Sequence, residues 1–342
     1  MSLLRGPRGY RYLLLGLLLV LLLSAAASMA FGSARIGMGT VFDILLRRAG
    51  FDVTPYWPQA QDSIVWLIRA PRVVLGMLVG AGLAMVGCAL QAVTRNPLAD
   101  PHLLGVSAGA AVGAVLAVLY VGEMFGGLTL PLFAFVGALG SMLLVLTLAA
   151  RHGRLESDRL LLAGVAVSFV LMALVNTLLF ASDHHSASSV MFWMLGGLGL
   201  ARWPLLWLPA LCVLVGGIAL WVLGRALNAL MSGEHTAVSL GFDTRRVRWQ
   251  VFVTTSLLTG VLVALSGAIG FVGLMLPHMA RRLVGAEHRR LLPVSALLGA
   301  LFVVWVDVAA RELLAPQDLP IGIATAAIGG LFFILLLRRE HG

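Results

Sequence analysis

Residues 70–93 read APRVVLGMLVGAGLAMVGCALQAV, and after Arg72 this stretch carries no charged side chain. An α-helix needs about 20 consecutive apolar residues to cross the hydrocarbon core of a bilayer, so the stretch predicts a membrane-spanning helix. Comparable apolar runs, bounded by Arg, Pro, Gly or polar clusters, recur along the chain. They predict about ten transmembrane helices, at residues 12–31, 70–93, 103–121, 130–150, 160–181, 204–224, 249–267, 268–284, 291–310 and 320–337.

The composition of the whole chain supports a membrane environment. Of 342 residues, 60% are apolar and 11% are charged, and the mean hydropathy is +0.99. A soluble domain of this size carries roughly a quarter charged residues. The chain is therefore predicted to be an all-α, polytopic membrane protein. One transmembrane domain is expected over residues 1–342, with short re-entrant or surface helices between the spans.

The distribution of arginine predicts the orientation of these spans. Every one of the 24 basic residues is an arginine, and with a cytoplasmic N-terminus most of them fall in cytoplasmic segments. This bias follows the positive-inside rule and places both termini in the cytoplasm. Because topology explains most of the net charge of +9, the charge gives no support for a nucleic-acid partner.

The first apolar run has two possible interpretations. It follows Arg5, Arg8 and Arg11 and ends in an alanine-rich stretch, which also describes a secretory signal peptide. Its length of about 20 apolar residues is enough to span a bilayer, which favours an uncleaved first helix.

The absence of lysine from the sequence excludes one kind of site. A phosphate-binding loop of the form G-x-x-x-x-G-K-[ST] needs its lysine, so this chain cannot form one. If ATP drives the protein, another subunit binds the nucleotide.

Two outer segments are too long for simple turns. Residues 40–48, TVFDILLRR, are followed by Gly50 and predict a short surface helix. In 182–203 a polar stretch precedes an apolar one at 190–197 that is too short to span, which predicts a periplasmic surface helix near a central opening. Glycines spaced by four predict close approach of helices, at Gly76 and Gly80 and at Gly105, Gly109 and Gly113.

Few ionisable groups lie inside the predicted spans, and each is a candidate for function because its burial is expensive. Asp307 has Arg311 four residues later on the same helical face, so a structural ion pair is the simplest account. A proton relay in an ion-coupled secondary transporter would need several acidic groups in series. There is no H-E-x-x-H motif for an intramembrane enzyme, no metal site is predicted, and Cys88 and Cys212 read as core residues.

Several motifs that follow one another from about residue 64 to the C-terminus resemble the permease family of ABC importers for iron-siderophores, haem and cobalamin. They are RAPR at 69–72, GAGLA at 80–84, NPLADP at 96–101, LGVSAG at 104–109, RLLLAG at 159–164, WMLGG at 193–197, GAIGFVGL at 267–274 and LPIG at 319–322.

The resemblance implies a type II ABC importer permease with ten helices, which is not itself an enzyme and binds no cofactor. The implied partners are a second permease copy, most simply in a homodimer, two ABC ATPase subunits that bind ATP and Mg, and a periplasmic substrate-binding protein. The implied location is the bacterial inner membrane.

The resemblance also assigns residues. Within 225–248, the pattern Gly-Glu-x-x-Ala-x-x-Leu-Gly resembles the coupling helices that dock on the ATPase, and its residues are Gly233, Glu234, Ala237, Leu240 and Gly241. The cytoplasmic gate is matched by Asn96 and Leu98 and, in the facing loop 155–159, by Ser157 and Asp158. Docking of the binding protein is implied for Arg69, Arg72 and Arg311.

Cargo is the least determined feature. His and Met are axial ligands that haem iron accepts, and four such residues are expected near the outer mouth: His184, His185, Met191 and Met194. They make haem the first expectation, with ferric siderophore and cobalamin as alternatives. The same residues can also be ordinary packing and solvated side chains.

Overall fold

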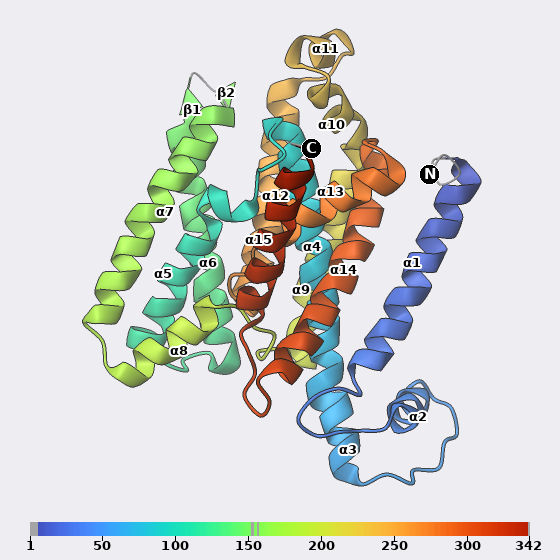
Figure 1. Cartoon of the computed structure of the whole chain (residues 1–342). Coiled ribbons are helices and arrows are strands. Elements are labelled where there is room, and N and C mark those ends of the chain that lie inside the picture. Colours follow the sequence, from blue (N-terminus) through green and yellow to red (C-terminus); the bar gives the residue numbers. More distant parts are fainter. Residues whose placement is uncertain (1–5, 152–153, 156, 341–342) are drawn as a thin grey trace.

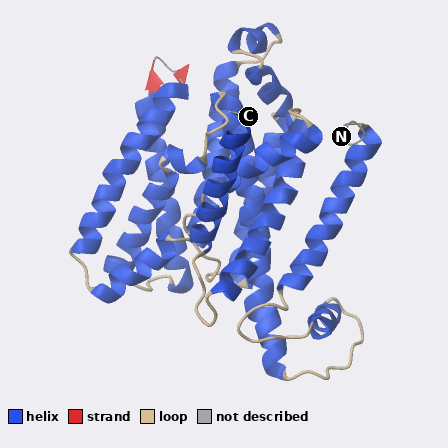
Figure 2. Ribbon diagram, in the orientation of Figure 1, coloured by secondary structure: helices blue, strands red, loops and turns tan. Residues whose placement is uncertain are grey.

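The computed structural model describes residues 6–151, 154–155 and 157–340. These residues fold mainly into helices that run side by side (Figures 1 and 2). Ten helices correspond in order to the ten predicted spans: α1 (Pro7–Ser28), α4 (Ala70–Thr94), α5 (Val106–Leu116), α6 (Thr129–Ala149), α7 (Ser157–Phe180), α9 (Trp203–Val222), α12 (Thr244–Ser266), α13 (Val272–Val284), α14 (His288–Leu313) and α15 (Ile321–Glu340).

Seven of these helical segments are long and apolar enough to cross a membrane. The other three predicted spans form shorter helices. The α5 segment continues through a π-helical turn, η4 (Ala117–Val121), α13 is 13 residues long, and the apolar part of α15 covers Ile321–Leu336. Short spans of this kind need neighbouring protein around their ends, because unpaired backbone is not tolerated in lipid.

Short elements connect the spans. They include α2 (Met38–Arg48), α3 (Gln59–Ser63), the π-helical η2 (Ile64–Arg69), the 3₁₀ turn η5 (Gly126–Leu128) and α8 (His184–Met194). The 3₁₀ turn η3 (Pro101–Leu104) precedes α5, and α10 (Gly224–Met231) and α11 (Glu234–Ser239) follow α9. The hairpin of β1 (Ala150–Arg151) and β2 (Arg154–Leu155) is antiparallel and pairs Ala150 with Leu155. The surface helices expected at 40–48 and within 182–203 are thus present, as α2 and α8.

The loops fall at two ends of the molecule (Figure 1). α11, the β1–β2 hairpin and the described ends of the chain lie toward one end, and α2, α3 and α8 lie at the other. The segments expected on the cytoplasmic side therefore share one end, which we call the inner end, and α2, α3 and α8 mark the outer end.

The centre of the molecule is the contact between α4 and its neighbours. Of the 25 residues of α4, 20 are buried. A Cβ atom on Gly80 would lie 2.1 Å from the carbonyl oxygen of Gly299 in α14, and one on Gly87 would lie 2.0 Å from that of Gly273 in α13. Glycine is therefore required where these backbones touch. The same holds for Gly113 of α5 against Phe133 of α6, as the spacing of four predicted.

The long apolar stretch at 249–284 contains the expected break. α12 ends at Ser266, and helix resumes only at Val272. Gly267 and Phe271 both have positive φ, of 64° and 67°, which reverses the chain between the two helices. The predicted start of the second helix at 268 is thus four residues early, because hydropathy continues through this non-helical turn.

Candidate functional site

A cluster of charged side chains lies at the outer ends of α4 and α14. The carboxylate of Asp307, which is 2% exposed, stands between two guanidinium groups. Arg72 Nε is 2.9 Å from Asp307 Oδ1, and Arg311 Nε is 3.0 Å from Asp307 Oδ2. Arg72 also donates to Asp318 Oδ2 at 2.6 Å. The predicted Asp307–Arg311 ion pair is confirmed, and the structure adds Arg72 as its second cation.

Two of the predicted docking arginines are buried and form hydrogen bonds within the chain. Arg69 and Arg311 are each 6% exposed. Their guanidinium groups donate to the carbonyl oxygens at and beyond the end of α1, those of Ser28, Met29, Phe31 and Ala34. Of the three predicted docking residues, Arg72 is the one that borders an open cavity. The docking role of all three stays a prediction.

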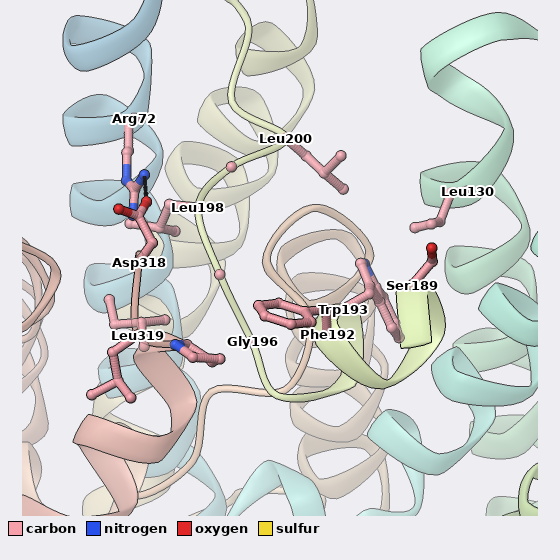
Figure 3. A pocket seen from close by; sticks show the side chains of 14 residues that line it. Arg72, Leu130, Ser189, Phe192, Trp193, Gly196, Leu198, Leu200, Asp318 and Leu319 are labelled. Atoms are coloured by element: carbon pink, nitrogen blue, oxygen red, sulfur yellow. Dashed lines mark hydrogen bonds and ion pairs between the residues drawn. The ribbon is translucent and has the colours of Figure 1, made fainter. Parts of the chain in front are cut away.

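That cavity, the outer cavity, has a volume of about 310 Å³ (Figure 3). The paired Arg72 and Asp318 lie on one side of it, and Phe192 and Trp193 of α8 lie across from them. The backbone of 196–199 and residues 319–321 complete the lining. Apart from one ion pair, the outer cavity is therefore mainly apolar.

Two further cavities share lining residues with the outer cavity or with each other. The middle cavity, of about 270 Å³, lies between α5, α7 and α8, and the inner cavity, of about 390 Å³, lies between η3, α13 and α15. Trp193 lines both the outer and the middle cavity, and His102 lines both the middle and the inner one. The three cavities thus form a series in which each neighbouring pair shares one ring.

The predicted cargo contacts do not converge on this series. His184 and His185 lie exposed in the first turn of α8, and Met191 is 56% exposed; none of the three lines the outer, middle or inner cavity. Met194 does line the middle cavity. The exposed Asp183 caps α8, and the Ser186 amide, 2.9 Å from its carboxylate, lowers the pKa of Asp183.

His102 is the functional candidate that sequence reasoning missed. Its Nε2 is 2.9 Å from the carbonyl oxygen of Ile269, and its Nδ1 is 2.7 Å from Ser107 Oγ. Because a carbonyl oxygen only accepts, Nε2 donates and Nδ1 accepts from the serine hydroxyl. An ionisable residue at the edge of the predicted span 103–121, directly after Pro101, was the available signal, since ionisable residues at membrane depth are candidates by default.

Within the described residues, no three His, Cys, Asp or Glu side chains are grouped so that they could hold a metal ion. Both ring nitrogens of His102 are already hydrogen-bonded, so this histidine is not free to coordinate one. Cys88 is buried and Cys212 half-buried, and neither is in a disulfide.

The predicted gate residues lie at the inner end. Asn96 follows the left-handed Arg95, and its Oδ1 accepts a hydrogen bond from the Leu98 amide at 2.9 Å, which leaves Leu98 56% exposed. Ser157 and Asp158 form the start of α7. Glu156, in the same predicted loop, lies outside the described residues.

The predicted coupling segment folds as the helix pair α10–α11. Gly233 (φ 118°) precedes α11, and Gly241 (φ 84°) follows it. Ala237 is fully buried against this chain's own core, whereas Leu240 is 63% exposed. Glu234 Oε2 accepts from Arg248 Nη2 at 3.2 Å. The exposed large apolar side chains of α11 and its C-cap are Val238 and Leu240, whereas Ala237 faces this chain's own core; the coupling role of the segment stays a prediction.

Comparison with known proteins agrees with this architecture. The model of the FecCD transport family matches residues 17–339. The chain is 42% identical to the uncharacterized ABC transporter permease protein YvrB of Bacillus subtilis, over 82% of this chain and 80% of that protein. It is 39% identical to the vitamin B12 import system permease protein BtuC of Vibrio cholerae, over 83% and 86% of the two chains.

A solved structure shows the same fold. It is described as an inward-facing conformation of a metal-chelate type ABC transporter and aligns with a TM-score of 0.84 at 32% identity, over 96% of this chain and 99% of that one. These matches show a transport subunit, and they leave no support for an intramembrane enzyme or an ion-coupled carrier. The chain is a multi-pass permease of an ABC importer and belongs to the FecCD transport family.

Proposed function

We propose that this permease imports cobalamin or a closely related corrinoid across the bacterial inner membrane, from periplasm to cytoplasm. The observation that carries the proposal is the similarity to a protein named as a vitamin B12 import permease. Its sequence identity to this chain, 39%, is close to the 42% of the uncharacterized permease described above. Cobalamin was an alternative to haem on sequence grounds, and the names of these relatives support it as the first candidate.

The cavities support a cargo that arrives with its metal already enclosed. Their linings are mainly apolar, and no metal-ligand cluster exists among the described residues. The argument for haem rested on four residues, of which only Met194 reaches the cavity series. Haem and ferric siderophores therefore become competing outcomes of the test.

The test is uptake into proteoliposomes that contain the permease, its ATPase and its binding protein. Cobalamin, haem and a ferric siderophore are each supplied at equal concentration, and ATP-dependent accumulation is measured. We expect cobalamin to accumulate. Accumulation of haem or siderophore alone would replace cobalamin and keep the importer assignment. A His184→Ala, His185→Ala double variant serves as a control, and we expect it to retain full uptake, because neither side chain lines a cavity.

The functional unit in this proposal is a homodimer of permease chains with two ATPase subunits, which bind ATP and Mg, and one periplasmic binding protein. The whole chain then acts as one permease domain with both termini in the cytoplasm. α7 carries a row of exposed apolar side chains at Leu162, Phe169, Val170 and Leu174, and Ser168 and Met172 of the same helix line the middle cavity. A second copy packed on this row would enclose the cavities between the two chains.

A single cysteine tests that dimer. In a background of Cys88→Ala and Cys212→Ala, Phe169→Cys is expected to form a disulfide between two copies in membranes. Leu211→Cys in α9, which is 50% exposed, is the matched control and is expected to form no cross-link, because α9 lies outside the proposed interface. Cross-linking at both positions, or at the control alone, would contradict the arrangement.

Docking of the binding protein is proposed at the outer cluster, with Arg72 as its accessible member. Arg72→Gln removes a charge that borders the outer cavity, and we expect weaker, less salt-sensitive binding of the partner. Charge-reversing substitutions of Arg69 and Arg311 would not test docking alone, because both arginines donate hydrogen bonds to carbonyl oxygens at the end of α1. On the inner side, we propose coupling through α10–α11 and gating at Asn96, Leu98, Ser157 and Asp158.

A further inference from the structure

Four breaks between helices meet beside the cavity series. They are the segments 95–105 before α5, 195–202 before α9, 267–271 before α13 and 314–320 before α15. In a membrane protein, non-helical backbone of this kind is tolerated where it is packed in protein or lines a cavity. How these breaks are tied to each other decides whether they move together.

Three of the four breaks are joined by backbone alone. The Ile321 amide donates to the carbonyl oxygen of Gly196 at 2.9 Å, and the Gly197 amide donates to that of Ser266 at 2.8 Å. A Cβ atom on Gly267 would lie 2.0 Å from the carbonyl oxygen of Trp193, and one on Gly322 would lie 2.2 Å from that of Leu195. These segments form one tightly packed layer, the turn layer, directly behind the outer cavity.

The fourth break is tied to the turn layer by a side chain. His102 Nε2 donates to the Ile269 carbonyl oxygen, while Nδ1 holds Ser107 at the start of α5. The His102 amide is itself held by Asp100 Oδ1 at 2.9 Å, which fixes η3 in the turn that follows Asn96 and Leu98. The ring of His102 thus stands between the turn layer and the turn at the inner end of α4.

We propose that His102 is a positioning residue for transport: its imidazole ties η3 to the turn layer, so that a displacement at the outer cavity moves the turn at Asn96–Asp100. This inference rests on the proposed importer function. Asp318 begins the chain of contacts, since it pairs with Arg72 at the outer cavity three residues before Ile321. The other contacts are backbone hydrogen bonds or packed glycines. The contact of His102 is made by a side chain, so a substitution removes it and leaves the backbone hydrogen bonds in place.

The first test needs neither cargo nor ATPase. Hydrogen–deuterium exchange is measured on the full-length permease in nanodiscs, for the wild type and His102→Ala, with His102→Gln as the conservative variant. Loss of the tie is expected to speed exchange of amides in 98–107 and 267–275 about fivefold in His102→Ala. His102→Gln, whose amide nitrogen can donate to Ile269, is expected to restore protection. Unchanged exchange in folded His102→Ala overturns the tie.

The second test measures ATP hydrolysis by the complete complex, with and without the cargo-loaded binding protein. We expect His102→Ala to keep its basal rate within about twofold and to lose at least about fivefold of the stimulation, with His102→Gln restored. Ser107→Ala keeps the bond to Ile269 and is expected to behave as the wild type. Full stimulation of His102→Ala would reduce the histidine to a packing role and overturn the proposal.

The two tests separate the two proposals. If no cargo stimulates the wild-type complex, the proposed function fails, and the exchange measurement still decides whether His102 ties η3 to the turn layer. If the wild type is stimulated and His102→Ala is too, the function stands and the positioning role fails.

Discussion

Helices α4 and α7 have almost the same mean hydropathy but opposite surroundings. In the most apolar window, 78% of the residues of the α4 segment are buried inside the chain, whereas 22% are buried in α7. α4 contacts α14 and α13 through glycines at backbone distance. α7 presents Phe169, 74% exposed, and Val170, 69% exposed, to its surroundings.

The difference shows what apolar composition does and does not determine. Hydropathy predicts that a segment is shielded from water. It does not distinguish whether the segment is covered by the rest of its own chain, by lipid or by a second copy of the chain. Small residues are the additional signal. Glycine at the contact allows backbones to approach and marks a helix that packs within the bundle. The following predictions test this distinction, from the largest effect to the smallest.

The largest effect is expected at the outer end of α4. Asp307→Asn removes the carboxylate that pairs with Arg311 and Arg72. Arg72 keeps Asp318, but the buried Arg311 is left without a carboxylate partner, which costs about 3–5 kcal/mol. Thermal unfolding of the purified permease measures it. Asp318→Asn is the matched control, because its carboxylate is 50% exposed and its loss costs about 0–1 kcal/mol. Equal losses in both variants would show that burial does not govern this cluster.

The next effect is expected in the glycine contacts of α4. Gly80→Ala places a methyl group 2.1 Å from the Gly299 carbonyl oxygen, and the helices must separate, at a cost of about 1–3 kcal/mol. Gly140→Ala in α6, where no heavy atom lies within 4 Å, is expected to be neutral or slightly stabilising. The midpoint of thermal unfolding distinguishes them. A neutral Gly80→Ala would remove the basis for the comparison.

In α7 the expected effect falls on association and not on folding. Phe169→Ala should change the stability of the single chain by no more than about 0.5 kcal/mol, since the side chain is exposed. It should weaken dimerisation by about 2 kcal/mol if Phe169 is an interface anchor. Analytical ultracentrifugation in detergent measures the dimer. Phe252→Ala in α12, a buried site, is the contrasting control and is expected to lose about 3–5 kcal/mol of folding stability.

The smallest effect is expected at the exposed C-cap of α11. Leu240→Ser removes an exposed apolar side chain, so folding is unchanged, and ATPase affinity should fall by about 1 kcal/mol. Binding of the purified ATPase to nanodisc-held permease measures it. A bulky Ala237→Leu should instead lower the stability of the permease itself, because Ala237 is fully buried. The reverse pattern would restore Ala237 as the contact residue.

The sequence predicted the helical runs, the breaks and the Asp307–Arg311 pair because each depends on local pattern. Glycine spacing, hydropathy and an i, i+4 charge pair are all visible along one segment. It did not predict that Arg72 would share Asp307, or that Arg69 and Arg311 would turn toward the end of α1. Those contacts join residues more than 200 positions apart or satisfy backbone carbonyls, which have no signature in the sequence.

His102 illustrates the same limit at the candidate site. Its neighbours Pro101 and Gly105 mark a break, but its partner Ile269 belongs to another break about half the chain away. The four predicted cargo contacts do not lie together for a related reason. His184 and His185 are close in sequence to Met194, yet the helical turn of α8 and its exposed first turn direct them away from the cavities.

The end of α1 has a consequence for the synthesis of the protein. Its last carbonyl groups receive their donors from Arg69 and, 280 residues after Phe31, from Arg311. At about 5–20 residues per second, a ribosome needs tens of seconds to reach that arginine after the first helix has emerged. Until then, two of the four carbonyl oxygens at and beyond the end of α1, those of Ser28 and Phe31, lack their arginine donor. A nascent chain halted before residue 311 is therefore expected to expose this end to periplasmic proteases, whereas the finished chain protects it.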